Sequence, residues 1–427
     1  MLNSLHKYVN TILKSLHIQC DAFVYDIASE IPEWCQSICI THQFLIVLPD
    51  SSDYAERVER FIGQRVFVFG TNLYWFAGEK LLTPIKAKKS ESAAPKRDVR
   101  SSLNCVTRLP DWLDVFLFRD LQAEWNPDFQ KFDHNLYRSH DENKTYLGTY
   151  FPRTYADVFC IFENLFKNKI YKATIKKRTS IDILSVGCGT GGDIIGLLTV
   201  IDKYCGHSTI INITAIDGNA DALEFARRII VKYQEVNNRT LSCDFRHKTI
   251  QDFSVEQFNE LEGNSYDFIM SSKMVCEVIA AGNGTTDNSY YDFVKTFFPF
   301  LKFEGVCLLL DVTTRCPHLD SYYPMMLGRQ INRAIQENDR MALVVPRSCA
   351  IYGKECSIET CFHQKEFTIS HSGVRSDKCR VAYRILGHRP FVQNIIKFDN
   401  SSKLSVSCDR FCKFTEHFET TDDAYYV

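Results

Sequence analysis

The stretch that decides the fold is residues 187–193, GCGTGGD, which follows directly on the apolar segment 181–186 (IDILSV). Segment 181–186 has the pattern of a buried strand, and residues 193–204 (DIIGLLTVIDKY) have that of the helix that the turn opens. Glycine allows the backbone to turn sharply and to approach a ligand closely, and the N–H groups of the first helical turn then face that ligand. Strand, glycine turn and helix in this order predict a binding site at the turn.

Strand and helix patterns continue to alternate on the carboxyl side of this turn. Residues 219–236 predict a long helix, and further strands are predicted at residues 211–217, 241–250, 266–272, 305–312 and 379–386. Such alternation is typical of a doubly wound, Rossmann-like α/β fold with a mostly parallel sheet. Ligands of these sheets bind at the carboxyl ends of the strands, where the strand order reverses. We therefore expect the glycine turn to lie at that edge.

Two kinds of ligand fit a glycine turn. Gly187, Gly189 and Gly192 satisfy the G-x-G-x-x-G pattern of dinucleotide-binding proteins. Against a dinucleotide, Asp193 would place a carboxylate beside a pyrophosphate, where like charges repel. Asp217, the next acid at a strand end, also follows Gly187 by about 30 residues, whereas dinucleotide folds carry their acid after about 20. A cationic ligand tolerates an acid at the turn better.

Residues 184–193 (LSVGCGTGGD) and 215–227 (AIDGNADALEFAR), with 249–253, 266–272 and a fifth strand ending at Asp311, resemble the class I S-adenosylmethionine-dependent methyltransferases. The resemblance covers about residues 140–390 and implies a methyltransferase that binds S-adenosylmethionine. It implies a cofactor site made of Gly187, Cys188, Gly189, Gly191, Asp193, Asp217, Gly218, Gln251, Asp252 and Ser271.

The resemblance also implies roles for individual side chains. The glycine turn would pass beneath the methionine part of the cofactor, and Asp217 would accept hydrogen bonds from both ribose hydroxyls. Gln251 and Asp252 would lie near the adenine, and Ser271 would face the transferred methyl group. Local structure offers alternatives: Asp217 and Asp252 could each cap a helix, Asp217 beside Asn219, and Ser271 could simply end a strand.

A weaker likeness lies upstream of the glycine turn. Residues 149–166 (TYFPRTYADVFCIFENLF) are similar to the helical lead-in of methyltransferase-like proteins associated with the small ribosomal subunit. That likeness implies that Arg153 pairs with the cofactor carboxylate and that Tyr150 stacks or hydrogen-bonds nearby. The alternative is a packed helix start with a solvated Arg153. The chain lacks the clustered metal-binding cysteines of that group.

No residue is assigned a catalytic role, because methyl transfer from a sulfonium mainly requires alignment and the exclusion of water. A base such as Glu277 is needed only if the acceptor loses a proton. Residues 271–274 read SSKM where enzymes that methylate amino groups of nucleic acids carry an acid or amide, two prolines and an aromatic residue. Cys276 and Cys316 are loosely similar to the cysteines of RNA C5 methyltransferases, although Val275 stands where those carry proline.

The acceptor is unresolved. Segment 316–337 is expected to overhang the active site, with His318, Tyr322 and Tyr323 as candidate lining residues. RNA is slightly favoured by two basic stretches, residues 86–100 and 167–178, and a small molecule or a protein is the alternative. A different class is an inactive assembly factor that keeps the cofactor fold.

Five regions are expected along the 427 residues: an accessory α/β domain (1–85), a basic linker (86–100), a helical cap (101–178), the methyltransferase core (179–395, with an insertion at 316–360) and a C-terminal tail (396–427). The formal net charge is −2, which disfavours a chain-wide polycation.

The 17 cysteines raise the question of compartment. Residues 1–20 lack a signal-peptide core, and no stretch reaches the roughly 18 apolar residues of a membrane span. We expect a cytoplasmic protein with mostly reduced thiols and no membrane partner; import into an organelle is the alternative. No C-x-x-C pair occurs, so no stable metal site is expected.

Overall fold

A computed structural model divides the chain into two compact units, Met1–Arg97 and Asp98–Val427. In the second unit it describes residues 105–127, 136–281, 288–316, 319, 321–346 and 362–399. In the first unit it describes short pieces only: residues 9–10, 13, 23–26, 44–48, 54, 58, 67–69 and 72–77. The predicted linker (86–100), His318 and nearly all of the predicted tail lie outside the described residues.

The first unit contains a four-stranded antiparallel sheet. Its strands are ordered β1-β2-β4-β3, with bounds Phe23–Asp26 (β1), Phe44–Leu48 (β2), Phe67–Phe69 (β3) and Asn72–Ala77 (β4). The apolar runs at 44–48 and 67–69 thus form strands, as their β-branched and aromatic residues predict. Ile46 and Leu48 on β2 are buried.

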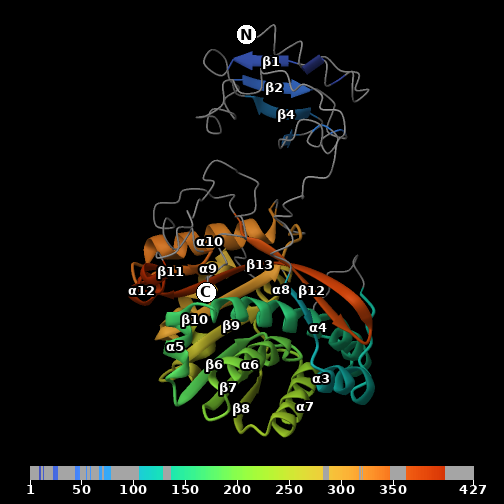
Figure 1. Cartoon of the computed structure of the whole chain (residues 1–427), viewed down its shortest axis with the longest axis vertical. Helices are drawn as coiled ribbons and strands as arrows, with labels where there is room; N and C mark the ends of the chain where they lie inside the picture. Colours follow the sequence, from blue (N-terminus) through green and yellow to red (C-terminus); the bar gives the residue numbers. More distant parts are fainter. Residues whose placement is uncertain are drawn as a thin grey trace, which may run out of the picture. The chain divides into compact units, whose positions relative to one another are not determined.

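The second unit is built on a nine-stranded sheet (Figure 1). Its order is β5-β12-β13-β10-β9-β6-β7-β8, and β11 pairs with β13. The bounds are Cys105–Arg108 (β5), Ser180–Val186 (β6), Ile210–Asp217 (β7), Leu241–His247 (β8), Tyr266–Ser272 (β9), Leu301–Val312 (β10), Met341–Val345 (β11), Gln364–His371 (β12) and Val374–His388 (β13). Strands β6 to β10 are mutually parallel, and β13 runs antiparallel to β10. The prediction of a mostly parallel, Rossmann-like α/β sheet is confirmed.

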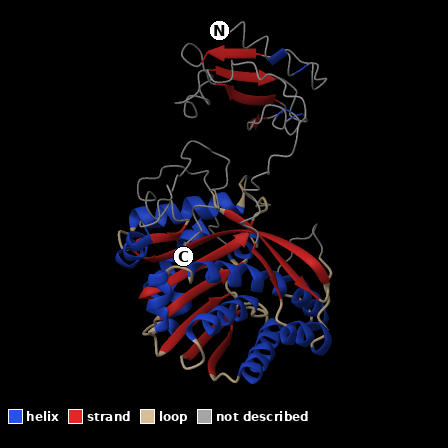
Figure 2. Cartoon of the chain, in the orientation of Figure 1, coloured by secondary structure: helices blue, strands red, loops and turns tan. Residues whose placement is uncertain are grey.

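Helices cover both faces of this sheet (Figure 2). Alternation along β6 shows why: Ile181 and Ile183 pack into one core and Leu184 and Val186 into the other. The first core includes residues of α4 (His140–Leu165), α5 (Lys169–Lys176), α6 (Gly192–Cys205), α7 (Ala220–Asn237) and α12 (Arg389–Asp399). The second includes residues of η5 (Val255–Leu261), α8 (Val275–Ala280), α9 (Ser289–Phe297), η7 (Phe298–Phe300) and α10 (Tyr323–Glu337).

The strand order reverses at β6, and this reversal positions the site. The chain lays β7 and β8 to one side of β6 and then crosses to place β9 and β10 on the other. Connections that leave β6 and β9 in opposite directions open a crevice between the carboxyl ends of these strands. The glycine turn follows β6 directly, so the crevice forms where the sequence predicts a site.

Residues 101–178 were expected to form a helical cap, and the structure differs there in one element. Strand β5 pairs in parallel with β12 and so belongs to the sheet, while α3 (Asp111–Val115), the π-helical turn η4 (Phe116–Asp120), α4 and α5 are helical. Four residues are too short a run to show strand periodicity, so only the long-range pairing reveals β5. Strands β11 and β12 run in the same direction along one edge of β13; β11 lies within the expected insertion (316–360), and β12 follows it.

As to membrane-spanning helices, metal-binding groups and disulfides, the following holds for the described residues only. None of its helices combines the length and apolarity that crossing a membrane needs. No group of three or more His, Cys, Asp or Glu side chains there is arranged to hold a metal ion. Cys160 on α4 takes part in a disulfide, whereas the free cysteines are Cys188, Cys205, Cys243, Cys276, Cys307, Cys316 and Cys379.

Candidate functional site

The turn after β6 is held by a strongly bent backbone. Gly187, Gly189 and Gly191 have φ values of 72°, 51° and 85°, a left-handed region that favours glycine. The N–H groups of Gly187 and Cys188 both donate to the carbonyl oxygen of Ile216, at 2.8 and 3.1 Å, which ties the turn to the end of β7. A Cβ atom on Gly187 would lie 2.3 Å from Cγ of Met274. Glycine is therefore required at this position by both conformation and space.

Asp217 ends β7 and faces this turn. Its carboxylate accepts hydrogen bonds from the N–H of Gly189 at 2.7 Å and from the N–H of Asn219 at 2.8 Å. Burial raises the pKa of Asp217, and the two backbone hydrogen bonds oppose that rise. Asn219, not Asp217, caps α7, because its side chain accepts from the N–H of Ala222. A carboxylate oxygen has two lone pairs, so both oxygens of Asp217 keep acceptor capacity toward a ligand.

An open cleft adjoins Gly187 and Asp217. Its empty volume is about 670 Å³, counting the solvent at its mouth. Its lining residues are Leu136, Tyr137, Tyr146, Gly187, Asp217, Gly218, Thr249, Ile250, Gln251, Ser272, Lys273, Met274, Glu277, Val278 and Ala281. The elements that supply them are the ends of β6, β7 and β9, the residues after β8, and α4 and α8.

Four of the expected cofactor residues, Gly187, Asp217, Gly218 and Gln251, line this cleft together. Gly218 also permits a close approach, since a Cβ there would lie 2.2 Å from Cδ2 of Leu136. Leu136 precedes α4 by only a few residues, so the segment before α4 closes over the end of β7.

Asp193 and Cys188, also expected near the cofactor, are buried beneath the turn. Asp193 accepts from the hydroxyl of Ser185 at 2.5 Å and from the N–H of Ile194 at 2.8 Å. Burial raises the pKa of Asp193 to about 6, despite those hydrogen bonds. Burial also raises the pKa of the Cys188 thiol. These positions support the turn from within the core.

Ser271 lies near the end of a strand, as its local alternative predicts, whereas Asp252 does not cap the following helix, whose N-cap is Ser254. Asp252 is exposed and accepts from the N–H of Ser254 at 2.8 Å and from the side-chain amide of Gln257 at 2.7 Å, so it shapes the turn before η5. Ser271 is 1% exposed near the end of β9, and its hydroxyl has no hydrogen-bond partner among the described residues. Neither side chain lines the cleft, whereas the neighbouring Gln251 and Ser272 do.

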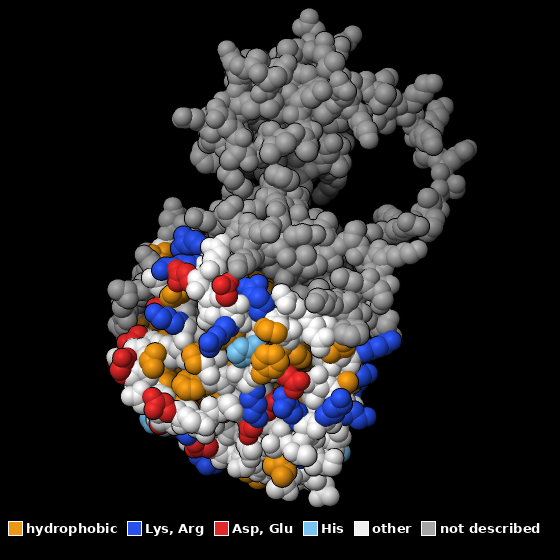
Figure 3. All heavy atoms as spheres, turned by 90° about the vertical axis from the view of Figure 1, so that its left-hand side faces the viewer, with side chains coloured by type: hydrophobic (Ala, Val, Ile, Leu, Met, Phe, Trp, Pro, Cys, Tyr) orange, Lys and Arg blue, Asp and Glu red, His pale blue; other side chains and the backbone are white. Residues whose placement is uncertain are grey.

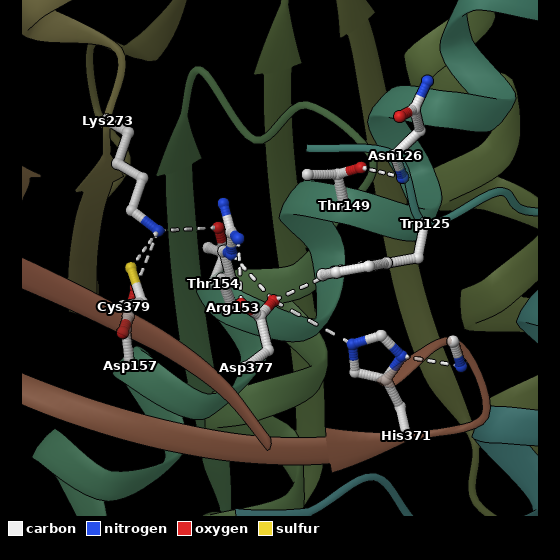
Figure 4. Close-up of polar contacts among 11 residues, drawn as sticks. Trp125, Asn126, Thr149, Arg153, Thr154, Asp157, Lys273, His371, Asp377 and Cys379 are labelled. Carbon is white, nitrogen blue, oxygen red and sulfur yellow. Dashed lines mark hydrogen bonds and ion pairs between the residues drawn. The ribbon is translucent and has the colours of Figure 1, made fainter. Parts of the chain in front are cut away.

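Lys273 is a lining residue that sequence reasoning did not single out as functional. It follows β9 with φ 60°, an uncommon value for a residue other than glycine, and its N–H donates to the carbonyl of Leu310 at 2.7 Å. Its ammonium lies 2.7 Å from the carboxylate of Asp157 on α4 and 3.5 Å from Sγ of Cys379 on β13 (Figure 4). The Asp157 side chain is fully buried, so this ion pair fastens the end of β9 to α4.

Arg153 occupies a neighbouring buried pair. Its guanidinium donates twice to the carboxylate of Asp377 on β13, at 2.8 Å each (Figure 4). Burial alone would raise the pKa of Asp377, but the nearby His371, whose Nε2 lies 4.0 Å away, and the hydrogen bonds from Arg153 and Trp125 outweigh burial and lower it to about 2. Sequence reasoning offered a cofactor carboxylate or solvent as the partner of Arg153. The structure gives Asp377, which lies 224 residues away along the chain.

Tyr146 is the second lining residue that the sequence did not reveal. Burial, together with the nearby carboxylates of Glu277 and Asp217, raises the pKa of its phenol. Its ring centre lies 4.9 Å from that of Tyr150, which is not itself among the lining residues. The signal that could have found Tyr146 is its spacing, since it lies one helical turn before Tyr150 on α4.

The other acceptor candidates lie away from the cleft. Cys276 is fully buried, and burial together with the nearby Asp311 raises the pKa of its thiol, which disfavours a nucleophilic thiolate. Tyr323 is buried and donates to the carbonyl of Cys276, while Tyr322 is half exposed. Cys316 is buried as well, and none of these side chains lines the cleft.

No protein-family model and no curated protein matches this chain. Among solved structures it is similar to a putative class I S-adenosylmethionine-dependent methyltransferase from Listeria monocytogenes, with 11% identity, 65% of this chain and 66% of that chain covered, and a TM-score of 0.33. It is also similar to a SAM-dependent methyltransferase from Aquifex aeolicus (14% identity, 52% and 90% covered, TM-score 0.28). A third is an O-methyltransferase from Bacillus cereus in complex with SAH (11% identity, 51% and 80% covered, TM-score 0.29). The likeness to ribosome-associated proteins gains no support from these comparisons.

Proposed function

We propose that this chain is an S-adenosylmethionine-dependent methyltransferase and that the cofactor binds in the cleft beside Gly187 and Asp217. One observation carries the proposal: the glycine turn after β6 and the carboxylate that ends β7 face the same cleft, at the reversal of the strand order. Such a crevice is where open α/β sheets take their ligands.

The donor set of the cleft fits this cofactor. A ribose presents two hydroxyl donors, and the Asp217 carboxylate retains acceptor capacity on both oxygens. Thr249 and Gln251, which follow β8, offer a hydroxyl and an amide to a purine edge. The absence of side chains at Gly187 and Gly218 leaves the backbone open to a close-lying ligand.

The charge of the cleft favours a cation over a dinucleotide. Two carboxylates, Asp217 and Glu277, are among the lining residues, and the ammonium of Lys273 is paired with Asp157. The two carboxylates stabilise a positively charged sulfonium, whereas they would repel a negatively charged pyrophosphate. Gly192, the third glycine of the dinucleotide pattern, allows close packing, since a Cβ there would lie 2.8 Å from the carbonyl oxygen of Phe151; such packing does not distinguish the two ligands.

When bound, the cofactor supplies an electrophilic methyl group. The residues of this chain then have to bind, align and exclude water. We infer that Asp217 binds one end of the ligand in the cleft. The residues at the end of β9 position the other end of the ligand, and the Lys273–Asp157 ion pair holds these residues in place. Glu277 lies within the cleft and can accept a proton where the acceptor has one to lose.

The acceptor proposed for first testing is RNA, with a small molecule or a protein as the alternatives. Support for RNA comes from the basic segment 167–178, which includes α5 and the residues that flank it. Transfer of tritiated methyl groups to fractionated cell lysate, scored separately in RNA, protein and small-molecule pools, decides among them. Label in the RNA pool is the expected result, and label in no pool favours the inactive assembly factor.

The cofactor itself is tested by calorimetry with S-adenosylmethionine and, in parallel, with NAD. We expect saturable binding of S-adenosylmethionine at micromolar concentration and none of NAD. Saturable binding of NAD with no heat from S-adenosylmethionine would overturn the proposal.

A further inference from the structure

Five lysines surround one short helix, α5, and are named here the α5 lysine surface: Lys167, Lys169, Lys172, Lys176 and Lys177. The helix is amphipathic, since Tyr171 and Ile175 are fully buried in the core beneath it. Burial of that face turns the lysines outward, and all of them are exposed except Lys172, which is half-buried. Residues 165–178 contain no Asp or Glu.

These lysines differ from most other basic residues of the unit in having no acidic partner. None of the five forms an ion pair or a hydrogen bond through its side chain with a described residue. Six cations elsewhere on the surface are paired: Lys144 with Asp141, Lys203 with Glu163, Lys232 with Glu235, Lys248 with Glu260, Arg333 with Glu337, and Lys378 with Glu366. Like charges one helical turn apart, such as Lys172 and Lys176, destabilise a helix. A bound polyanion would remove this repulsion.

An aromatic ring lies beside these charges. Tyr204, near the end of α6, is partly exposed, and its ring centre lies 5.9 Å from the ammonium of Lys172 and 5.6 Å from that of Lys203. Phe166 stacks against the ring at 5.4 Å and holds its orientation. Lysines beside an aromatic ring are the combination that binds single-stranded nucleic acid, because phosphates take the charges and bases stack on the ring. An acidic peptide or an anionic membrane would also be attracted by the charges, but neither brings a base to stack on the ring, so the ring favours nucleic acid.

The α5 lysine surface is separate from the cleft. α5 ends shortly before β6 begins at Ser180, at the amino edge of the sheet, while the cleft lies at the carboxyl edge. A strand of this length spans roughly 20 Å. In Figure 1 α5 lies on the left-hand side, which Figure 3 turns toward the viewer, and several Lys and Arg side chains are exposed there.

We propose that the α5 lysine surface, with Tyr204, binds single-stranded nucleic acid at a site distinct from the cleft. The lysines contact phosphates and Tyr204 stacks on a base. This binding requires no methyl transfer, so the site stands whether or not the cleft binds S-adenosylmethionine.

The test measures binding of the full chain to fluorescently labelled oligouridylate RNA and oligothymidylate DNA by fluorescence anisotropy. Each oligonucleotide has about 20 nucleotides, which is longer than most single-strand binding sites. Affinity should fall with salt. The K176E/K177E variant should bind at least tenfold more weakly, and its log–log salt slope should be smaller by about 1.4, at about 0.7 per lost contact. The matched control, R227E/R228E, reverses two adjacent exposed charges on α7 and should stay within twofold of wild type.

Two further variants separate binding from folding. K167Q/K169Q removes positive charge at the start of α5, which suits the helix dipole, so a loss of affinity there cannot come from an unfolded helix. Tyr204→Leu should weaken the oligonucleotide at least fivefold and leave binding of heparin, a polyanion without bases, unchanged; Tyr204→Phe should restore stacking. Tighter binding of RNA or of DNA then identifies the natural strand.

Four results would overturn the proposal. The first is affinity that does not change with salt, and the second is an equal loss of affinity in K176E/K177E and R227E/R228E. The third is a Tyr204→Leu variant that binds oligonucleotide and heparin as the wild type does. The fourth is wild-type protein that binds phosphatidylserine vesicles in preference to oligonucleotide.

Discussion

Asp217 is the residue on which the cofactor proposal depends most. Its carboxylate ends β7 inside the cleft, with acceptor capacity left over from two backbone hydrogen bonds. Asp217→Ala should weaken S-adenosylmethionine binding roughly 30-fold or more, because hydrogen bonds to a charged group are worth about 1.5–3 kcal/mol each. Calorimetry measures this. The control is Asp244→Asn on β8, whose carboxylate pairs with Arg246; equal affinities of all three proteins would remove the ribose assignment.

For Asp193 we predict an effect on how the free energy of unfolding depends on pH. Its folded pKa, about 6 because of burial, lies above the usual value near 4 of an unfolded chain. The folded state therefore disfavours the ionised form, and wild type should lose stability relative to Asp193→Asn as pH rises from about 4 to about 6. The loss is on the order of 2–3 kcal/mol and is constant at higher pH. Urea unfolding of both proteins between pH 4 and 8 measures it, and a pH-independent difference would contradict the burial argument.

At the scale of elements, the close crossing of α4 and α6 positions the glycine turn. A Cβ on Gly196 would lie 2.8 Å from the carbonyl oxygen of Tyr155, so any larger residue forces the helices apart. Gly196→Val should lower the free energy of unfolding by about 1–3 kcal/mol, as overpacking of a core does. Denaturant unfolding measures this, with Ala173→Val on the exposed side of α5 as control. An equal loss in the free energy of unfolding for the two variants would mean that α4 moves aside without cost, and it would contradict the prediction.

The Arg153–Asp377 pair joins α4 to β13 and predicts an acid-sensitive contact. Asp377→Asn should cost about 3–5 kcal/mol at pH 7, since Arg153 then loses its buried carboxylate partner. The folded pKa of Asp377, about 2, lies below its unfolded value, so the stabilising charge is present above about pH 4 and is lost as pH falls toward 2. The difference between wild type and Asp377→Asn should narrow over that range in unfolding experiments. A difference that persists unchanged at pH 2 would show that the charge of Asp377 is not its source.

At the scale of the whole molecule, the chain divides after Arg97 into two compact units. Among the described residues, those that line the cleft all belong to the unit Asp98–Val427. A chain of residues 98–427 should therefore bind S-adenosylmethionine within about twofold of the full chain, by calorimetry. Affinity more than tenfold lower, with an unchanged unfolding transition, would assign the first unit a part in cofactor binding.

The sequence by itself predicted the strands β6, β7, β8, β9 and β10, because each combines a run of apolar residues with turn or helix signals on either side. It also located the glycine turn and Asp217, since the turn chemistry and the acid at a strand end are local features. The basic character of residues 167–178 was equally visible.

Only the tertiary structure decided which side chains meet. Lys273 and Asp157 lie 116 residues apart and Arg153 and Asp377 lie 224 apart, and no local pattern encodes such pairs. The same holds for β5, a four-residue strand that exists only through its pairing with β12. Local sequence propensity determines helices, strands and turns. Which charged side chains form ion pairs depends on how distant segments pack together and become buried. For that reason the sequence determined the glycine turn and predicted a site beside it, and the structure alone showed that the carboxylates of Asp217 and Glu277 line one cleft there and that the α5 lysines face solvent near the amino end of β6.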